Sequence, residues 1–331
     1  MDRRWLKWVV VVCFIPLFIW GVTVSFDLYR LLYRPMVVFN NDSTIIILDK
    51  YTSAASFVQM LKTRGLIHSQ RLFLLLIRMQ GLTQQLKAGV YQVKEGESAE
   101  QFLTRVADGD VLTGALRIID GTTQAQVSAT LESAKYLTYR ATDWSAIATS
   151  FKSAEGLLLA DTYHYDAGSQ SKELLEHAHK NLQIFLDNSW QHRVLDLPYK
   201  TSYELLIAAS IIEKEAAIPE ERRLIAGVIV NRLRKNMPLQ MDPTVIYALG
   251  SHYKGQLTRD DLHIISPYNT YLYRGLPPTP IAMVGKDAID AAAHPSPTNF
   301  LYFVATGDGR HYFSENYEQQ KQAVARYRGT K

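Results

Sequence analysis

An uncharged run of 19 residues near the N-terminus, Trp8–Phe26, constrains this chain more than any other feature of its sequence. As a helix rising 1.5 Å per residue, the run spans about 28 Å, close to the ~30 Å hydrocarbon thickness of a bilayer. Pro16 within it is tolerable in a membrane helix. A helix buried in a soluble core would show a polar stripe, and a cleaved signal peptide would have a shorter apolar stretch and a small-residue cleavage site. We therefore expect one membrane anchor, with its helix at about 8–26.

The charges that flank the run predict its orientation. Three basic side chains precede it, and one acidic and two basic side chains follow it, namely Arg3, Arg4 and Lys7, then Asp27, Arg30 and Arg34. The positive-inside bias favours a cytoplasmic N-terminus. We therefore expect a single-pass protein of the cytoplasmic (inner) membrane, whose folded part is periplasmic or otherwise extracytoplasmic. The sole cysteine, Cys13, lies in the anchor, so the exported part is free of thiols, as suits an oxidising compartment.

The remaining charge excludes several function classes. The chain has a net charge of +4, but residues 1–36 carry five basic and two acidic side chains, which leaves only +1 for the rest. A nucleic-acid-binding protein would concentrate basic charge on its folded part, so no nucleic-acid partner is expected. One cysteine cannot form an intramolecular disulfide or a cysteine-based zinc site. The histidines show no metal-binding spacing, and no phosphate-binding glycine loop occurs, so neither a metal nor a cofactor is predicted.

Hydrophobic periodicity after the anchor predicts a mixed α+β fold. The first part alternates short strands and helices, expected at Thr44–Leu48, Ser53–Arg64, Ser69–Met79, Leu86–Val93 and Ser98 to about Asp108. Ser98 with Gln101 three residues later is a capping-box pattern. The second part is rich in helix, with a strand at Ala115–Ile119, helices near 122–133, 171–189, 202–218 and 220–235, and a strand at Leu301–Ala305. A loop at 263–280, rich in proline and tyrosine, cannot form a long helix and is of a length typical of functional loops.

The predicted helix at 202–218 carries two glutamates within an apolar surface. Acidic side chains in such a helix are costly unless they are used or paired. Glu213 and Glu215 point about 200° apart, so they cannot form a side-by-side pair. The neighbours of Glu213 on its face of the helix are small and leave room for a substrate, namely Ala209, Ser210, Ala216 and Ala217. The neighbours of Glu215 are bulky, namely Ile211, Ile212, Ile218 and Pro219. This favours Glu213 as the functional acid, although two solvated or arginine-paired carboxylates remain an alternative.

Several ordered motifs resemble the endolytic murein transglycosylase (YceG-like) family. They are IIEKE at 211–215, NRL at 231–233, LQMDPTVIYALG at 239–250, SPYNTY at 266–271, GLPPTPI at 275–281 and YFVATGDGRHYFS at 302–314. EGLLLADTY at 155–163 resembles another motif of the family, with Ala160 where the family usually has proline, and AGVYQVKEGES at 88–98 resembles its LysM-like subdomain. The resemblance implies an anchor in residues 1–36, a small LysM-like α/β module at 44–112 and a mixed α+β catalytic domain at 113–331.

The resemblance also implies an activity. The family cleaves the bond between N-acetylmuramic acid and N-acetylglucosamine within nascent peptidoglycan strands, leaves 1,6-anhydro ends and acts in cell-wall assembly. The expected partners are the glycan strands, the membrane and peptidoglycan synthases. The family's catalytic glutamate is assigned to Glu213. One carboxyl suffices for this reaction: protonated, it donates to the glycosidic oxygen, and ionised, it takes the proton of the muramoyl 6-hydroxyl that attacks C1. Glu213 must then start protonated, so burial is expected to raise its pKa.

Two further groups of residues are predicted to bind substrate. The first, in LQMDPTVIYALG, comprises Gln240, Asp242, Thr244 and Tyr247. Asp242 is expected to orient Glu213 or to stabilise positive charge on the sugar, with a turn or helix N-cap for Thr244–Leu249 as the alternative. The second group, in the tyrosine-rich loop, comprises Ser266, Tyr268, Asn269, Thr270 and Tyr271. Their hydroxyl and amide groups suit hydrogen bonding to sugar hydroxyls and N-acetyl groups. The alternative is that these residues only form a rigid wall of the loop.

Two rival functions remain at the level of sequence. A muramidase would hydrolyse the same bond with Glu213 and Asp242 as its carboxyl pair. A scaffold without enzymatic activity would bind the cell wall through the LysM-like module and recruit synthases.

Overall fold

The computed structural model describes residues 3–36, 45–148 and 151–328, with side chains from Phe14 onward in the first helix. Thr44, the expected first residue of the first strand, lies outside the described residues. The chain divides into two compact units. The first contains residues 1–114 together with 135–137 and 165–169, and the second contains 115–134, 138–164 and 170–331. Two short segments from later in the chain thus belong to the first unit. The sequence had predicted a continuous first module at 44–112.

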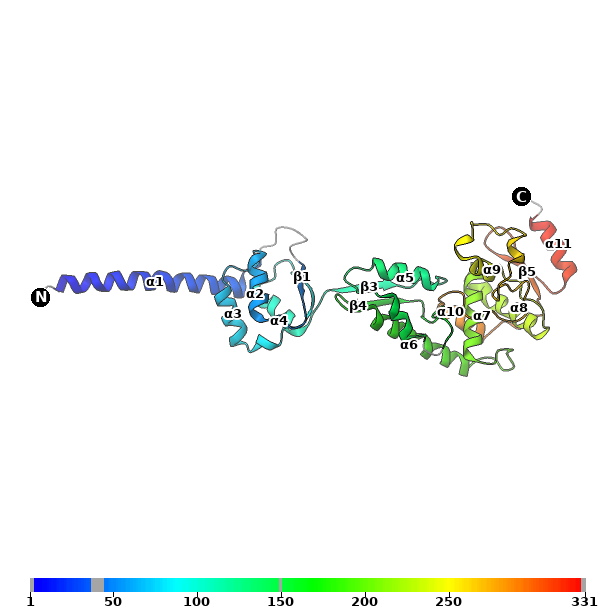
Figure 1. Ribbon diagram of the computed structural model, residues 1–331, viewed down its shortest axis with the longest axis horizontal. Coiled ribbons are helices and arrows are strands. Elements are labelled where there is room, and N and C mark those ends of the chain that lie inside the picture. Colours follow the sequence, from blue (N-terminus) through cyan, green and yellow to red (C-terminus); the bar gives the residue numbers. More distant parts are fainter. Residues whose placement is uncertain (1–2, 37–44, 149–150, 329–331) are drawn as a thin grey trace. The chain divides into compact units, whose positions relative to one another are not determined.

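Helix α1 spans Arg3–Tyr33 and is longer than the predicted 8–26 (Figure 1). Its segment Phe14–Tyr33 is the one helix among the described residues that is long and apolar enough to cross a membrane. Large apolar side chains there face solvent, with Phe18 73 % and Trp20 65 % exposed. At the end of the helix this changes, because Leu31 and Met36 are buried in the core of the first unit. The last turn of α1 is therefore part of that unit.

The first unit is a small α/β module in which two strands face three helices. Strand β1 (Ile45–Leu48) pairs antiparallel with β2 (Gly89–Gln92), and Ile46 lies opposite Tyr91. The helices are α2 (Ala54–Thr63), α3 (Gln70–Met79) and α4 (Ala99–Asp108), with a 3₁₀ turn at Leu82–Gln84. The predicted capping box of Ser98 and Gln101 is confirmed at α4, which ends at Gly109 in the left-handed region. Fully buried rings fill the core, namely Phe57, Phe73, Tyr91 and Phe102.

The second unit is mostly helical. Its helices are α5 (Gln124–Ser133), α6 (Ser171–Gln191), α7 (Ser202–Glu215), α8 (Arg222–Arg234), α9 (Asp242–Leu249), α10 (Lys286–Ala293) and α11 (Tyr317–Arg328). Strand β3 (Thr113–Arg117) pairs with β4 (Thr162–Asp166), and β5 (Tyr302–Ala305) pairs antiparallel with β6 (His311–Ser314). Short 3₁₀ turns lie at Ala141–Ala146, Pro219–Glu221, Gly250–His252 and Asp261–His263.

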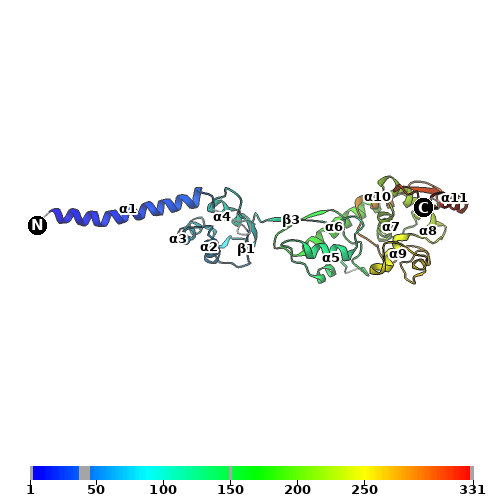
Figure 2. The same cartoon turned by 90° about the horizontal axis from the view of Figure 1, so that it is seen from above.

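Helix α7 is the centre of the second unit. It packs against α6, α8, α9 and α10 (Figure 1, Figure 2). Eight consecutive residues, 205–212, are buried, because apolar side chains surround the helix as its sequence predicts. The helix ends at Glu215 rather than at the expected 218, since Ala216 leaves the helical region with φ −79° and ψ 105°. This early end places Glu215 in the final residue of α7.

Candidate active site

The two glutamates in the last turn of α7, Glu213 and Glu215, lie in different surroundings. Glu213 is enclosed: its side chain is 4 % exposed, and Oε1 accepts a hydrogen bond from Nη2 of Arg222 at 3.2 Å. Its Oε2 accepts the backbone N–H of Gly285 at 3.0 Å. Burial raises the pKa of Glu213, as predicted, while the Gly285 N–H and the Arg222 guanidinium oppose that rise and Asp120 reinforces it. Both hydrogen bonds favour the ionised carboxylate, and Glu213 forms an ion pair with Arg222.

The small residues beside Glu213 accommodate protein backbone rather than leaving an open space. Ser210 Oγ accepts the backbone N–H of Ile281 at 3.0 Å, and residues 281–284 are all buried. A Cβ added to Gly121 would lie 3.3 Å from Cδ of Lys214, so this backbone also passes close to α7. The space beside Ser210 and Glu213 is therefore occupied by residues 281–285 and the turn at Gly121, whereas Ala216 is half-buried and Ala217 is exposed. Small side chains permit this approach because they keep the backbones close together.

Glu215 has the most strongly perturbed carboxyl group of α7. Burial, and next the negative charge of Asp242, raise its pKa to about 8, while the backbone N–H of Asp242 lowers it. Glu215 is also the last residue of α7. The negative end of a helix dipole disfavours a carboxylate there. Glu215 is thus largely protonated at neutral pH, at the point where the end of α7 meets the start of α9.

Asp242 lies beside Glu215, whereas the sequence predicted that it would orient Glu213 or stabilise positive charge on the sugar. It is exposed, and its Oδ1 accepts a hydrogen bond from the hydroxyl of Tyr271. Its charge acts on Glu215, whereas the partners of Glu213 are Arg222 and Gly285. The alternative N-cap role is wrong as well, because Met241 occupies the N-cap position of α9 and no side chain caps that end. The expected pairing of Asp242 with Glu213 is replaced by a pairing with Glu215.

Three of the predicted sugar-binding residues are buried and hold the site together. Thr244 and Thr270 are hydrogen-bonded through their hydroxyls at 2.8 Å, and the Thr270 hydroxyl accepts the backbone N–H of Met241 at 3.0 Å. Asn269 is fully buried; its amide donates to Leu262 O and Ile264 O at 3.0 and 2.9 Å. As placed, these side chains do not reach the surface, so they fasten the tyrosine-rich loop to α9.

The other predicted residues are at least partly accessible. Gln240 is exposed, with φ 52°, and its Oε1 accepts a hydrogen bond from Arg232 at 3.1 Å. Tyr247, Ser266, Tyr268 and Tyr271 are half-buried. The rings of Tyr247 and Tyr268 lie 4.8 Å apart, and the Tyr268 hydroxyl is hydrogen-bonded to Thr279 at 2.8 Å. Tyr271 thus lies at Asp242 near the end of α7, whereas Tyr268 lies near Tyr203 at the start of that helix.

Glu155 is a site residue that sequence reasoning missed, although it opens the motif EGLLLADTY. It is 4 % exposed. Its Oε2 accepts the hydroxyl of Tyr247 at 3.2 Å, and its Oε1 accepts the backbone N–H of Gln124 at 2.8 Å. Burial raises its pKa, and these hydrogen bonds oppose that rise. The presence of an acidic residue in a motif was the available signal, but only the folded chain places it against Tyr247.

The described part of the chain contains no group of three or more acidic, histidine or cysteine side chains that could hold a metal ion. The chemistry available at this site is therefore that of carboxyl, hydroxyl and amide groups. A protonated carboxyl at Glu215, next to an exposed carboxylate at Asp242, can donate a proton and stabilise a developing positive charge.

Comparisons with known proteins agree with the motifs. The sequence model of the YceG-like family matches residues 46–326. A Bacillus subtilis (strain 168) protein named endolytic murein transglycosylase is 30 % identical over 308 residues, which cover 85 % of this chain and 83 % of that protein. A protein of the same name from Streptococcus pneumoniae (strain ATCC BAA-255 / R6) is 34 % identical over 186 residues, 54 % of this chain and 33 % of that protein. A crystal structure of a YceG-like protein from Listeria monocytogenes covers 84 % of this chain and 98 % of its own, with a TM-score of 0.55 and 28 % sequence identity.

Proposed function

This chain belongs to the YceG-like family, and we propose that it is an endolytic murein transglycosylase, a lyase that cleaves peptidoglycan glycan strands internally. The bond cleaved is that between N-acetylmuramic acid and N-acetylglucosamine, and the product carries a 1,6-anhydro end. The observation that carries the reaction type is the match of residues 46–326 to the YceG-like family, and burial, with the charge of Asp242, raises the pKa of Glu215 at the end of α7 to about 8. A general acid needs a pKa near or above the working pH, because it must hold its proton until the glycosidic bond breaks.

The raised pKa of Glu215 and the hydrogen bonds of Glu213 lead us to assign the catalytic role to Glu215 rather than to Glu213. The sequence favoured Glu213 for the small residues around it, but those residues contact the 281–285 backbone. A guanidinium and an N–H group at 3.2 and 3.0 Å stabilise the ionised form of Glu213, which opposes its use as an acid. Glu215 has no such cationic partner among the groups that shift its pKa, and Asp242 next to it favours the protonated form. Glu213 therefore serves as a positioning residue.

The reaction needs one proton shuttle. Protonated Glu215 donates its proton to the glycosidic oxygen as the bond from that oxygen to C1 of the muramoyl residue breaks. The muramoyl 6-hydroxyl then forms a bond to C1, and its proton passes to the Glu215 carboxylate, which restores the starting state. No water is consumed. The attack is intramolecular and so benefits from a high effective molarity. The exposed Asp242 carboxylate, hydrogen-bonded to Tyr271, stabilises the positive charge that develops at C1.

Accessible residues around Glu215 are assigned to the glycan. Gln240 and Ser266 offer amide and hydroxyl groups for sugar hydroxyls and N-acetyl groups, and the tyrosines at 247, 268 and 271 offer aromatic faces for pyranose rings. The buried Thr244, Asn269 and Thr270 position that surface without touching the sugar. The anchor in α1 would hold the enzyme at the cytoplasmic membrane with its N-terminus inside, facing nascent strands and their synthases. The first unit would bind the wall as a LysM-like module.

Parallel substitution of the two glutamates tests the assignment. Glu215→Gln keeps the size of the side chain but cannot release a proton, so we expect cleavage of glycan strands to fall by at least about 100-fold, the lower end of general acid–base contributions. Glu213→Gln is the matched control and should keep the anhydro product. Circular dichroism and wall binding report whether each variant is folded. Loss of cleavage in Glu213→Gln with full activity in Glu215→Gln would return the role to Glu213.

A hydrolytic muramidase is the second candidate, because the charge of Asp242 acts on Glu215 and hydrolases use two carboxyl groups. The hydrogen bonds of Glu213 to Arg222 and Gly285 favour Glu215 over Glu213 as the partner of Asp242 in such a reaction. Mass spectrometry of the digested strands separates the reactions: an anhydro end is about 18 Da lighter than a reducing end, because the difference is one water. A wall-binding scaffold without activity would retain its cellular role in Glu215→Gln.

A further inference from the structure

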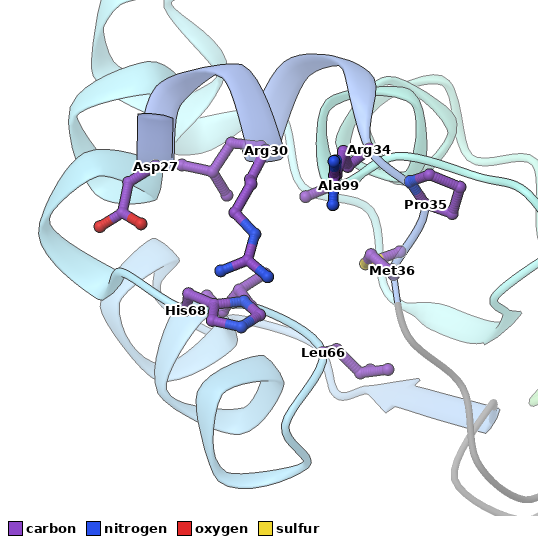
Figure 3. Close-up of a pocket in the computed structure, with 10 residues that line it drawn as sticks. Asp27, Arg30, Arg34, Pro35, Met36, Leu66, His68 and Ala99 are labelled. Atoms are coloured by element: carbon purple, nitrogen blue, oxygen red, sulfur yellow. The ribbon is translucent and has the colours of Figure 1, made fainter. Parts of the chain in front are cut away.

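We propose that the cavity at the junction of α1 with the first unit binds the phosphate headgroup of an anionic membrane lipid. The cavity has a volume of about 280 Å³ (Figure 3). Its walls come from the last two turns of α1, from residues 66–68 after α2 and from the first residue of α4. The inference rests on α1 crossing the membrane, as proposed above, and concerns a site in the first unit, whereas the carboxyls of α7 belong to the second.

Three basic side chains gather at this cavity. Arg30 is half-buried, and its guanidinium points across the opening toward the imidazole of His68 (Figure 3). Arg34, the residue directly after α1, is exposed. Within the part of the chain that the structure describes, none of these side chains forms an ion pair. Asp27 also lines the cavity but points away from Arg30, so an excess of positive charge is left for an anion.

The position of the arginines along α1 matches the depth of lipid phosphates. The uncharged run ends at Phe26, so Arg30 lies four residues, or about 6 Å, beyond the hydrocarbon edge, and Arg34 about 12 Å beyond it. Each headgroup layer is about 5–7 Å thick, from a ~40–45 Å bilayer with a ~30 Å core. Helical side chains lean toward the N-terminus of their helix, so the side chain of Arg30 leans toward the membrane. The Arg30 guanidinium can therefore meet a phosphate in that layer, and Arg34 adds positive charge at its outer side.

The lining suits a lipid better than a free anion. Leu31, Met36, Leu66 and Ile67 give the cavity an apolar wall, and each is buried in the first unit. A lipid offers a glycerol backbone to that wall and a phosphate to the arginines. Guanidinium groups bind phosphate through two parallel hydrogen bonds. An anionic lipid also concentrates near basic residues at a membrane surface, so the site would fix how the first unit sits on the bilayer.

Lipid retention by the full-length protein tests the proposal. The chain is reconstituted in nanodiscs of phosphatidylcholine with phosphatidylglycerol, and native mass spectrometry counts the lipids that stay bound. Wild type should retain phosphatidylglycerol over phosphatidylcholine, and Arg30→Gln/Arg34→Gln should weaken that retention about 25-fold, taking about fivefold, or about 1 kcal/mol, per arginine. Arg78→Gln/Arg117→Gln removes the same charge at exposed positions outside the cavity and should behave as wild type.

The outcomes are distinguishable. Equal retention of the two lipids, or equal retention by wild type and the cavity variant, overturns the proposal. Displacement of phosphatidylglycerol by millimolar inorganic phosphate would make this a site for free phosphate and also overturns it. A chain that does not enter nanodiscs refutes the anchor and this site together. Cleavage of soluble glycan strands, which depends on Glu215, should be unchanged in the cavity variant, so a failure here leaves the proposed activity to be judged by its own test.

Discussion

At the scale of single residues, two carboxyl groups that are two positions apart in the sequence have different surroundings in the folded protein. Glu213 bonds to Arg222 and Gly285, while Glu215 faces Asp242 at the end of its helix. Their residue type and helix are the same, so the difference in chemistry comes entirely from what packs against each. Burial raises both pKa values, but Arg222 and the Gly285 N–H oppose the rise at Glu213, whereas the charge of Asp242 adds to the rise at Glu215.

The raised pKa of Glu215 predicts a pH dependence of stability. A carboxyl whose pKa rises from 4.5 to about 8 on folding favours the folded state below pH 4.5, and this contribution is lost as the pH rises through 8. Glu215→Gln stays neutral, so it should gain stability over wild type between pH 5 and pH 9, by a few kcal/mol at about 1.4 kcal/mol per pKa unit. Thermal unfolding of both proteins across this range measures it. Parallel pH profiles would show that Glu215 ionises normally.

Tyr247 contacts both the buried Glu155, through its hydroxyl, and Tyr268, through its ring. Its effect on stability and its effect on substrate binding should therefore be separable by mutation. Tyr247→Phe keeps the ring but removes the hydrogen bond to Glu155, so we expect a loss of about 1 kcal/mol of stability with little change in KM. Tyr247→Ala also removes the ring next to Tyr268 and should raise KM. Unfolding curves together with steady-state cleavage measure both. A KM that rises equally in the two variants would mean that the hydroxyl itself contacts the substrate.

At the scale of elements, one buried arginine joins the segment before α9 to the rest of the second unit. Arg232 of α8 donates from Nε to Leu301 O at 2.6 Å and from Nη1 to the carbonyl groups of Pro238 and Leu239 at 3.0 and 2.9 Å. Burial lowers its pKa. The guanidinium thereby fixes residues 238–240, which lead into Asp242, against the strand that begins at Tyr302.

Replacing this arginine should loosen the entry to α9. Arg232→Lys keeps the charge but cannot span three carbonyl groups with one ammonium group, so we expect a loss of about 2 kcal/mol, from unsatisfied buried carbonyls. Hydrogen exchange at residues 236–242 should rise more than in α6. Arg234→Lys is a control on the same helix, since Arg234 is exposed. Equal exchange in the two variants would show that Arg232 does not hold this segment.

At the scale of the whole molecule, α1 serves both as the candidate membrane segment and as part of the first unit. Leu31 and Met36 are buried in the core of that unit, and Met36 N donates to Glu97 O at 2.7 Å. The end of the helix therefore has a structural role that is independent of any membrane.

Two truncations distinguish these roles. Removal of residues 1–24 deletes most of the apolar run but keeps Leu31 and Met36, so we expect a soluble, folded protein that still cleaves glycan strands. Removal of residues 1–36 also empties part of the core and should destabilise the first unit by about 2–5 kcal/mol, as for loss of large buried side chains. Cell fractionation and thermal unfolding measure the two effects. Equal stability of the truncated proteins would mean that the end of α1 does not support the unit.

Local signals in the sequence predicted much of the framework. Caps and periodicity predicted α2, α3 and α4 to within one or two residues, because Ser53, Ser69 and Ser98 each accept a hydrogen bond from the first turn of their helix. The apolar run predicted α1, and the ordered motifs indicated the family. Helix α10 and strand β4 were missed because they are short, and helix α11 was missed because it has little apolar surface.

The sequence by itself thus determined a helix able to span a membrane, the capped helices of the first unit, and a buried helix with Glu213 and Glu215 near its end. The tertiary structure alone decided which groups surround each of these glutamates and how far each pKa is raised. Residues 281–285 lie about 70 positions from α7 along the chain, and no local pattern indicates that their backbone fills the space beside Glu213. The pKa of a buried carboxyl is set by the groups that surround it in space, and those groups meet only when the chain has folded.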